Sequence, residues 1–151
     1  MATVQDILSL KGREVATIES ERSVLEAAHE MNRRRIGSVV VTKGSKVIGI
    51  FTERDILVRV VGECRDPEKT QVGTVMTAPV VSCTPETDVK ECWAMVTKRR
   101  IRHIPVLLGG NLVGIVTSGD IMARESRERE VTIESLAEYI GGPGVHAHGG
   151  L

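Results

Sequence analysis

Gly-Ile-Phe-Thr-Glu-Arg-Asp, at residues 49–55, returns at residues 114–120 as Gly-Ile-Val-Thr-Ser-Gly-Asp. Both stretches belong to a longer repeat, because residues 15–57 align with residues 80–122 at a constant offset of 65, without a gap and with 14 identities in 43 pairs. Packing alone would require only the apolar positions. The shared glycine, threonine and aspartate therefore indicate a polar site in each copy. Two copies are too few for a solenoid, which needs about three units, so we expect a pseudo-twofold pair.

The first half of each copy predicts an amphipathic helix, since apolar residues recur at i, i+3, i+4 and i+7. These residues are Val24, Ala27, Ala28 and Met31 in the first copy, and Val89, Cys92, Trp93 and Val96 in the second. Ser23 is placed to cap the first helix, and Asp88 or Thr87 the second. A basic triplet ends each helix, at residues 33–35 and 98–100. Stabilisation of the helix dipole is the simplest interpretation of these charges.

A β-hairpin and a second helix complete each copy. β-rich runs at residues 36–42 and 101–108 lead through turns at 43–46 and 109–111 to strands at 47–51 and 112–116. The second helices start from Asp55 and Asp120, and similar lead-in segments at residues 4–8 and 72–76 precede the copies. Each unit therefore reads β-α-β-β-α, and the fold class is α/β (α+β), with the two units related by a pseudo-twofold axis.

The predicted organisation has four parts joined by short connections. Residues 1–65 form the first unit with its lead-in segment, and residues 66–124 form the second, with a linker at 62–70. Residues 125–142 form a C-terminal amphipathic helix suited to docking or dimerisation, and residues 143–151 form a disordered tail. The apolar face of that helix consists of Ile133, Leu136, Ala137 and Ile140.

Composition narrows the class of protein. The chain has 151 residues, 41% of them hydrophobic, and a formal net charge of zero. Because the net charge is zero and the sequence has no long block of basic residues, we expect no nucleic-acid partner. There is no membrane-length apolar run and no signal peptide at the start, so we expect no membrane partner and a cytoplasmic location. Cys64, Cys83 and Cys92 form no Cys-x-x-Cys pair and are interpreted as reduced structural thiols.

The motif Gly-Ile-x-Thr-x-x-Asp predicts a binding pocket where a buried strand meets a helix. Free backbone N–H groups at a helix start favour anions, and a carboxylate can accept from the two hydroxyls of a ribose. The threonine hydroxyl can donate to a ligand oxygen, and the glycine lets a ligand or backbone approach closely. The alternative is that Thr-x-x-Asp only caps the helix. Duplication in register favours the pocket.

With these motifs the chain resembles a tandem pair of cystathionine-β-synthase (CBS) domains, also called a Bateman module, of the stand-alone kind. The resemblance covers about residues 4–124. It rests on the duplicated motif, on Arg-His-Ile-Pro-Val at 102–106, and on the lead-ins Asp-Ile-Leu and Thr-Val-Met-Thr. It implies two units packed through their sheets, with two clefts between them for adenosine-containing compounds such as AMP, ADP, ATP, NAD or S-adenosylmethionine. An adenine nucleotide would be a regulatory ligand, and no catalytic cofactor or metal is implied. A homodimer and an unidentified regulated protein are the implied partners.

The resemblance also assigns residues to each cleft. Cleft 1 would contain Asp120 for the ribose, together with Asp6, Ala16, Ile36, Gly37, Ser38, Val39, His103, Ile115, Thr117 and Gly119. Cleft 2 would contain Asp55 for the ribose, together with Ser38, Ile50, Thr52, Arg54, Thr74, Val81, Ile101, Arg102, His103 and Ile104. Adenine would lie between aliphatic side chains, because the chain has one Phe, one Trp and one Tyr.

The two clefts are expected to bind with unequal affinity. Arg54 stands beside Asp55, whereas its counterpart Gly119 supplies no charge to cleft 1. A charge-assisted contact contributes about 1.5–3 kcal/mol, so its loss weakens binding about tenfold or more. His103 could tune phosphate binding through its charge near pH 6.5. Its alternative role is partial burial with a backbone hydrogen bond, and His29 is expected on a helix surface.

Three functional hypotheses remain open at the level of sequence. The first is a regulatory module that senses an adenine nucleotide. The second is an oligomerisation or interaction scaffold without a ligand. The third, an enzyme, is disfavoured because we find no Ser-His-Asp order, metal-ligand cluster or phosphate-binding Gly-x-x-x-x-Gly-Lys loop in the sequence.

Overall fold

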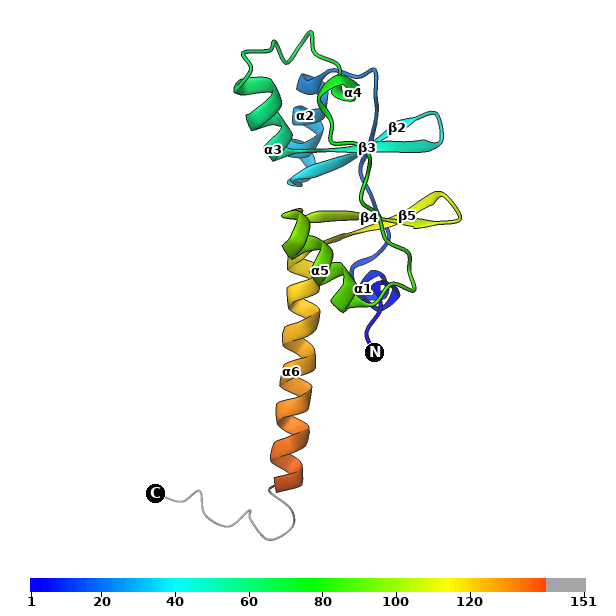
Figure 1. Cartoon of the computed structure of the whole chain (residues 1–151), viewed down its shortest axis with the longest axis vertical. Coiled ribbons are helices and arrows are strands. Elements are labelled where there is room, and N and C mark those ends of the chain that lie inside the picture. The colour runs from blue at the N-terminus through cyan, green and yellow to red at the C-terminus, as the bar shows by residue number, and fades with distance from the viewer. Residues whose placement is uncertain (141–151) are drawn as a thin grey trace.

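The computed structural model describes residues 1–140 and places two α+β units one above the other, with a long helix extending from one end (Figure 1). The hairpins of the two units face each other, and strand β3 of the first unit contacts strand β5 of the second. The predicted packing of the units through their sheets is confirmed. The predicted tail at residues 143–151 lies outside the described residues. No helix within residues 1–140 is both long and apolar enough to cross a membrane.

The first unit follows the predicted order of elements. Its elements are β1 (Thr17–Glu19), α2 (Val24–Arg34), β2 (Ser38–Lys43), β3 (Lys46–Thr52), α3 (Glu53–Asp55) and the π-helix η1 (Ile56–Val61). Strand β1 pairs in parallel with β2, and β2 pairs antiparallel with β3. The Ser23 side chain caps α2 by accepting from the Glu26 amide, as expected. Helix α3 starts at Glu53 rather than at Asp55, because Thr52 is its N-cap.

The second unit lacks the first strand that the repeat predicts. Its elements are α4 (Val72–Val75), α5 (Val89–Arg99), β4 (His103–Leu108), β5 (Asn111–Thr117) and α6 (Ser118–Ile140). Parallel pairing is reduced to one bridge, between Cys83 and Val106. In the first unit the amide of Val40 donates to the carbonyl of Ala16. Its counterpart Pro105 has no N–H group, so this ladder bond cannot form.

The predicted C-terminal helix is not a separate element. Helix α6 runs without interruption from Ser118 to Ile140, so the prediction of a distinct helix at 125–142 was wrong at its start. The first repeat stops its helix at Val61, where Gly62 follows, whereas the second has no glycine or proline over residues 120–140. An ion pair between Arg124 and Glu128 joins successive turns. Residues 141 and 142 lie outside the described residues.

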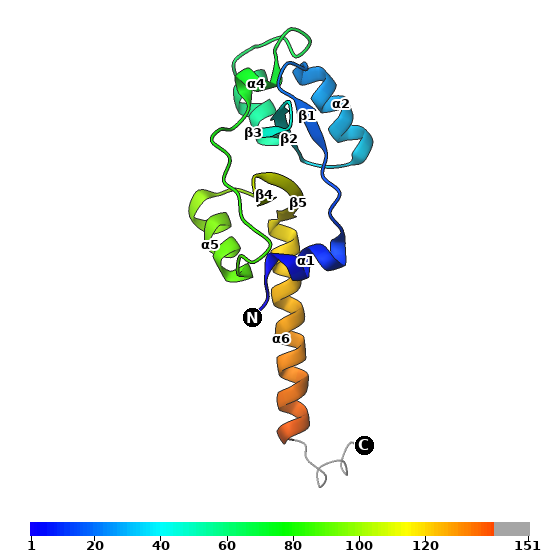
Figure 2. The same ribbon diagram turned by 90° about the vertical axis from the view of Figure 1, so that its right-hand side faces the viewer.

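The core of each unit contains a lead-in helix, but not the one that directly precedes that unit's repeat in the sequence. Helix α1 (Val4–Lys11) precedes the first unit in sequence but buries Val4, Ile7 and Leu8 in the core of the second. Figure 2 shows α1 beside the start of α6. Helix α4 buries Val72 and Val75 in the core of the first unit. The boundaries 1–65 and 66–124 therefore describe the repeat along the chain. They do not describe the packed units, because each lead-in helix packs in the core of the other half.

Two glycines of the repeat allow these lead-in helices to approach the sheets. A Cβ added at Gly114 would lie 2.7 Å from Cδ2 of Leu8, and one added at Gly49 would lie closer still to Sδ of Met76. Real side chains do not tolerate such contacts. The glycines at the start of the duplicated motif therefore serve close packing of the lead-in segments.

Replacing Leu8 with alanine should test whether α1 is part of the second core. Leu8 is 1% exposed, so Leu8→Ala should lower the free energy of unfolding by about 2–5 kcal/mol through lost burial and a residual cavity. Leu10 on the same helix is 64% exposed, and Leu10→Ala should stay within about 0.5 kcal/mol of the parent. Urea unfolding followed by circular dichroism measures both. Equal losses for the two variants would contradict this packing.

Candidate functional site

The duplicated threonine and aspartate form a capping box at the start of each helix. The Thr52 amide donates to Oδ2 of Asp55 (3.0 Å), and the Asp55 amide donates to Oγ1 of Thr52 (3.3 Å). In the second copy the Thr117 amide donates to Oδ2 of Asp120 (2.8 Å), and the Asp120 amide donates to Oγ1 of Thr117 (3.1 Å). The capping interpretation therefore holds in both copies. What else each carboxylate contacts differs between them.

Asp55 is enclosed by neighbouring protein. Its side chain is 7% exposed, and its second oxygen, Oδ1, accepts from the Thr77 hydroxyl (2.9 Å). The Thr77 amide also donates to the carbonyl of Ile50 (2.8 Å), and the Ile50 amide returns a bond to Thr77. The chain after α4 thus adds one antiparallel bridge to β3 and covers the carboxylate. Both oxygens of Asp55 already have partners.

Asp120 faces a side chain instead of a backbone segment. Nζ of Lys11 donates to Oδ2 of Asp120 (2.7 Å) and to the carbonyl of Ile115 (3.0 Å). The side chains of Lys11 and Asp120 are 29% and 24% exposed. Ile115 and Asp120 are the repeat counterparts of Ile50 and Asp55. The ammonium group of Lys11 therefore donates to the two acceptors whose counterparts accept from Thr77 in the first copy. Oδ1 of Asp120 has no hydrogen-bond partner among residues 1–140.

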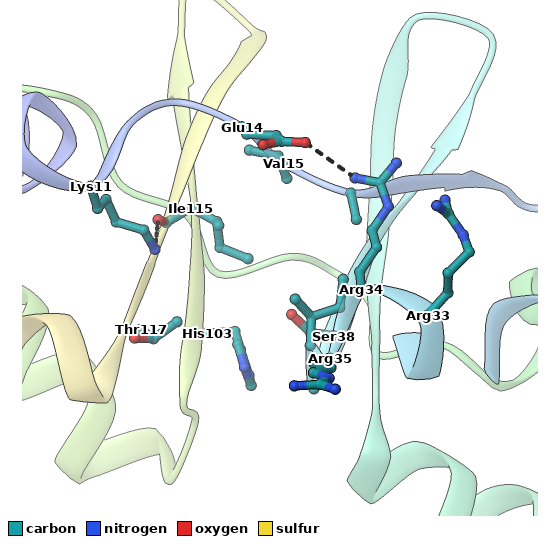
Figure 3. Close-up of a pocket in the computed structure, with 13 residues that line it drawn as sticks. Lys11, Glu14, Val15, Arg33, Arg34, Arg35, Ser38, His103, Ile115 and Thr117 are labelled. Carbon is teal, nitrogen blue, oxygen red and sulfur yellow. Dashed lines mark hydrogen bonds and ion pairs between the residues drawn. The ribbon is translucent and has the colours of Figure 1, made fainter. Parts of the chain in front are cut away.

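A cavity of about 740 Å³ lies beside Lys11, between the two units. Its lining comes from α1 and the chain after it, from the end of α2, and from strands of both hairpins (Figure 3). The lining residues are Lys11, Glu14, Val15, Ala16, Arg33, Arg34, Arg35, Ile36, Gly37, Ser38, His103, Ile115 and Thr117. Its volume falls in the range of small-molecule pockets, about 300–1,000 Å³.

The cavity contains four cationic side chains and one carboxylate. Arg33 and Arg34 pair with Glu30 on their own helix, and Arg34 also lies 3.6 Å from Glu14. Arg35 makes no ion pair in the part of the chain that the structure describes. Its left-handed backbone, with φ of 54°, ends α2 at the edge of the cavity. The comparison of Arg54 with Gly119 predicted little charge in cleft 1, because it did not include the end of α2.

His103 lines the cavity between Thr117 and Ser38 in the view of Figure 3, and it is the repeat counterpart of Ser38. Burial lowers the pKa of His103 below its usual value, and the nearby Arg102 and Lys11 act in the same direction. The carboxylates of Glu53 and Asp120 oppose this shift. The net result is an imidazole that stays neutral to lower pH than a free histidine. His29 is exposed on α2, as predicted.

The structure gathers most of the residues assigned to cleft 1. Seven of them line the cavity: Ala16, Ile36, Gly37, Ser38, His103, Ile115 and Thr117. Asp120 stands behind Lys11, and Gly119 is exposed on the first turn of α6. Val39 instead is fully buried in the core of the first unit, and Asp6 caps α1 through the amide of Thr3. Lys11, Glu14 and Val15 were not predicted as cleft residues, and the triplet 33–35 was predicted only to stabilise the helix dipole.

The residues assigned to cleft 2 are less well gathered. Ser38 and His103 line the cavity of cleft 1. Thr52 and Asp55 form the capping box, and Ile50 pairs with Thr77. Ile104 is fully buried in the second core, with Ile101 packed against it. Val81 is half-buried, while Arg54, Thr74 and Arg102 are exposed. Whether these residues bind a ligand stays a prediction.

The described cysteines have the character of structural thiols. Cys83 and Cys92 are buried together in the second core. A hydrogen bond with Cys92, and burial, raise the pKa of Cys83. Cys64 is exposed in the linker and is not among the cavity-lining residues.

Comparison with known proteins gives one consistent answer. A sequence profile described as CBS domain matches residues 3–62 and again residues 72–127. The chain is 31% identical over 149 residues to the CBS domain-containing protein CBSX3, mitochondrial, of Arabidopsis thaliana, covering 93% of this chain and 72% of that protein.

Solved structures agree with the sequence comparison. The CBS-domain containing protein ATU1752 from Agrobacterium tumefaciens is 37% identical with a TM-score of 0.78, covering 82% of this chain and 99% of that one. A hexameric CBS-CP12 protein from bloom-forming cyanobacteria is 26% identical with a TM-score of 0.73, covering 95% and 90%.

The lowered pKa of His103 predicts a pH dependence of stability. Below about pH 6.5 His103 of the unfolded chain binds a proton, whereas His103 of the folded chain does not yet bind one. The free energy of unfolding should therefore fall as the pH drops toward the folded pKa. Above the unfolded pKa, the contribution of neutral His103 to stability is fully present. Urea unfolding at about pH 7.5 and about pH 5.5 should show a smaller pH effect for His103→Gln than for the parent. His29→Gln is the exposed control, and an unchanged pH effect in His103→Gln would refute the assignment.

Proposed function

We propose that this chain, which belongs to the CBS domain family, is a regulatory module that senses an adenosine-containing nucleotide in the cleft beside Asp120. Stand-alone CBS-domain proteins are generally regulatory and ligand-sensing rather than catalytic. The observation that carries the proposal is the difference between the two clefts. Asp55 is covered by a paired backbone segment, whereas Asp120 adjoins an open cavity through one lysine side chain.

The chemistry of this cavity suits the three parts of a nucleotide. Oδ1 of Asp120 can accept from ribose hydroxyls while Oδ2 continues to cap α6. Ile36 and Ile115 offer aliphatic surface for adenine from opposite units. Arg35 and Lys11 supply positive charge for phosphate. Charge-assisted bonds to phosphate are about twice as strong as neutral ones.

Regulation follows from the position of the cavity between the units. Its walls come from α2 and β2 of the first unit and from β4 and β5 of the second. A ligand held by both walls favours the arrangement in which the walls have the right separation. Such a ligand shifts the population only through its greater affinity for that arrangement. A partner protein that recognises this arrangement would receive the signal.

The structure also favours one ligand per chain. Opening the cleft at Asp55 would require the bridge between Thr77 and Ile50 to break and would expose the buried carboxylate. The expectation of unequal clefts is retained in this proposal, but its direction is reversed: the absence of charge at Gly119 predicted the weaker site in cleft 1, and we propose cleft 1 as the stronger site. Cleft 2 then has the ligand-free, structural role that the scaffold hypothesis assigned to both clefts.

A thermal-shift panel with AMP, ADP, ATP and NAD tests this function. A ligand at about 100 times its dissociation constant should add about 2.7 kcal/mol to the stability and raise the midpoint by several degrees. Asp120→Ala should abolish the shift. Asp88, which caps α5 through the amide of Lys90, provides the matched control, since Asp88→Ala removes a capping aspartate away from the cavity. No response of the parent to any nucleotide would favour the scaffold hypothesis.

We also propose that the chain forms a homodimer through the helices that follow the hairpins. Helix η1 exposes Leu57, Val58 and Val61, each more than half accessible, and Met122 is the exposed counterpart of Leu57 on α6. Apolar residues clustered on one short helix typically mark an interaction surface. A relative of this fold is described as hexameric, which supports self-association. Ile133, Leu136 and Ala137 on α6 are also exposed.

A charge introduced on η1 should prevent this self-association. Leu57→Glu should shift the mass measured by size-exclusion chromatography with light scattering from dimer to monomer, because an unpaired charge would be buried in the interface. Leu108 lies at the tip of the second hairpin and is 48% exposed, so Leu108→Glu should leave the mass unchanged. A monomeric parent, or a dimer that survives Leu57→Glu, would contradict the proposed interface.

A further inference from the structure

We infer that Lys11 makes the cleft beside Asp120 selective for adenosine compounds that carry phosphate over those that do not. The inference rests on the proposed function, because it concerns the ligand of the same cleft. It adds a specificity-determining residue from outside the duplicated motif and a chemical class of ligand. Lys11 belongs to the lead-in helix, so the repeat gives no indication of its role.

The fold fixes the backbone of Lys11 and leaves its side chain able to move. Lys11 is the last residue of α1, and the amide of Gly12 closes that helix by donating to the carbonyl of Leu8 (2.8 Å). Leu8 is packed against Gly114 of β5. The Lys11 side chain therefore starts from a defined point in the cavity lining, three residues before Glu14, the next lining residue along the chain. Its side chain remains 29% exposed.

Comparison of the two copies shows what Lys11 replaces. In the first copy, Thr77 satisfies the Ile50 carbonyl with its amide and Asp55 with its hydroxyl. In the second copy, Nζ of Lys11 satisfies both equivalent acceptors. Leu8 and Met76 face equivalent glycines, so the lead-in segments correspond at an offset of 68. The counterpart of Lys11 is then Pro79, which has no charge. At this point the open cleft has a lysine side chain where the closed cleft has the amide and hydroxyl of Thr77, and the cation nearest Asp55 is instead Arg59 of the following helix, 3.7 Å from Oδ1.

The hydrogen bonds of Lys11 affect the binding of charged and uncharged ligands in opposite ways. An ammonium group has three N–H donors, and Asp120 and Ile115 occupy two of them. A phosphate can take the third and gives Lys11 a second anionic partner. An uncharged nucleoside offers only ribose hydroxyls, which must share the Asp120 carboxylate with Lys11. The same lysine therefore strengthens binding of a nucleotide and hinders binding of the nucleoside.

The other cations of the cavity do not duplicate this role. Figure 3 places Arg33, Arg34 and Arg35 on the side of the first unit, opposite Lys11, Ile115 and Thr117. Arg33 and Arg34 are already paired with Glu30. Lys11 is the one cavity-lining cation, among the described residues, that contacts the carboxylate proposed to bind ribose.

Calorimetric titration of the full chain with ATP and with adenosine tests this inference. Lys11→Met keeps most of the apolar length of the side chain and removes its charge. It should weaken ATP binding at least about tenfold and leave adenosine binding unchanged or tighter. Lys11→Arg should retain the preference for ATP, because it keeps the charge. Lys46→Met, at the exposed start of β3, is the control for loss of a lysine elsewhere.

The outcomes separate this inference from the function on which it rests. A parent that binds neither ATP nor adenosine overturns both. A parent that binds ATP, with a Lys11→Met variant whose preference for ATP over adenosine is unchanged, overturns only the role of Lys11. A general loss of structure would weaken both ligands together and would leave their ratio unchanged, so the ratio distinguishes selectivity from damage to the fold.

Discussion

A carboxylate that accepts the backbone N–H group of the threonine three residues before it holds both strand-to-helix junctions of this molecule. Asp55 and Asp120 each make this bond. Each bond fixes how a helix starts from the second strand of its hairpin, and it uses only one of the two carboxylate oxygens. The remaining architecture determines what meets that second oxygen. The same pair of residues can therefore be purely structural in one copy and available to a ligand in the other.

The lead-in helices decide between these two outcomes. Both pack against a glycine of the facing strand, Leu8 on Gly114 and Met76 on Gly49. After α4 the chain continues alongside β3, and Thr77 seals Asp55 with backbone and side-chain bonds. After α1 the chain turns away at Gly12 toward the first unit, and only the Lys11 side chain reaches Asp120. A backbone bridge closes its cleft more firmly than one partly exposed ion pair does, since exposed pairs contribute about 0–1 kcal/mol.

This asymmetry gives a simple physical basis for a sensor. One cleft is closed within the first unit by the bonds of Thr77 to Ile50 and Asp55. The cleft beside Asp120 is open, and a ligand bound there would add interactions between the two units. Because the open cleft has walls from both units, the energy of a ligand bound there is applied directly to their relative arrangement. The exposed apolar residues of η1 lie on the first unit and Met122 lies on the second, so a change in that arrangement would alter the spacing of the surfaces proposed for self-association.

The amino-acid sequence predicts the repeat, the helix and hairpin of each copy, and the pairing of threonine with aspartate, because these features depend on residues that are close to one another along the chain. It also indicated a cleft at Asp120, where seven of the proposed residues do line one cavity. It did not indicate the loss of a strand opposite Pro105, the continuity of α6, or the place of Lys11 and the triplet 33–35 in the cavity. Only the tertiary structure placed Lys11 on Asp120 and Thr77 on Asp55. These contacts join residues 109 and 22 positions apart, and their formation depends on how whole helices pack, which no local spacing encodes.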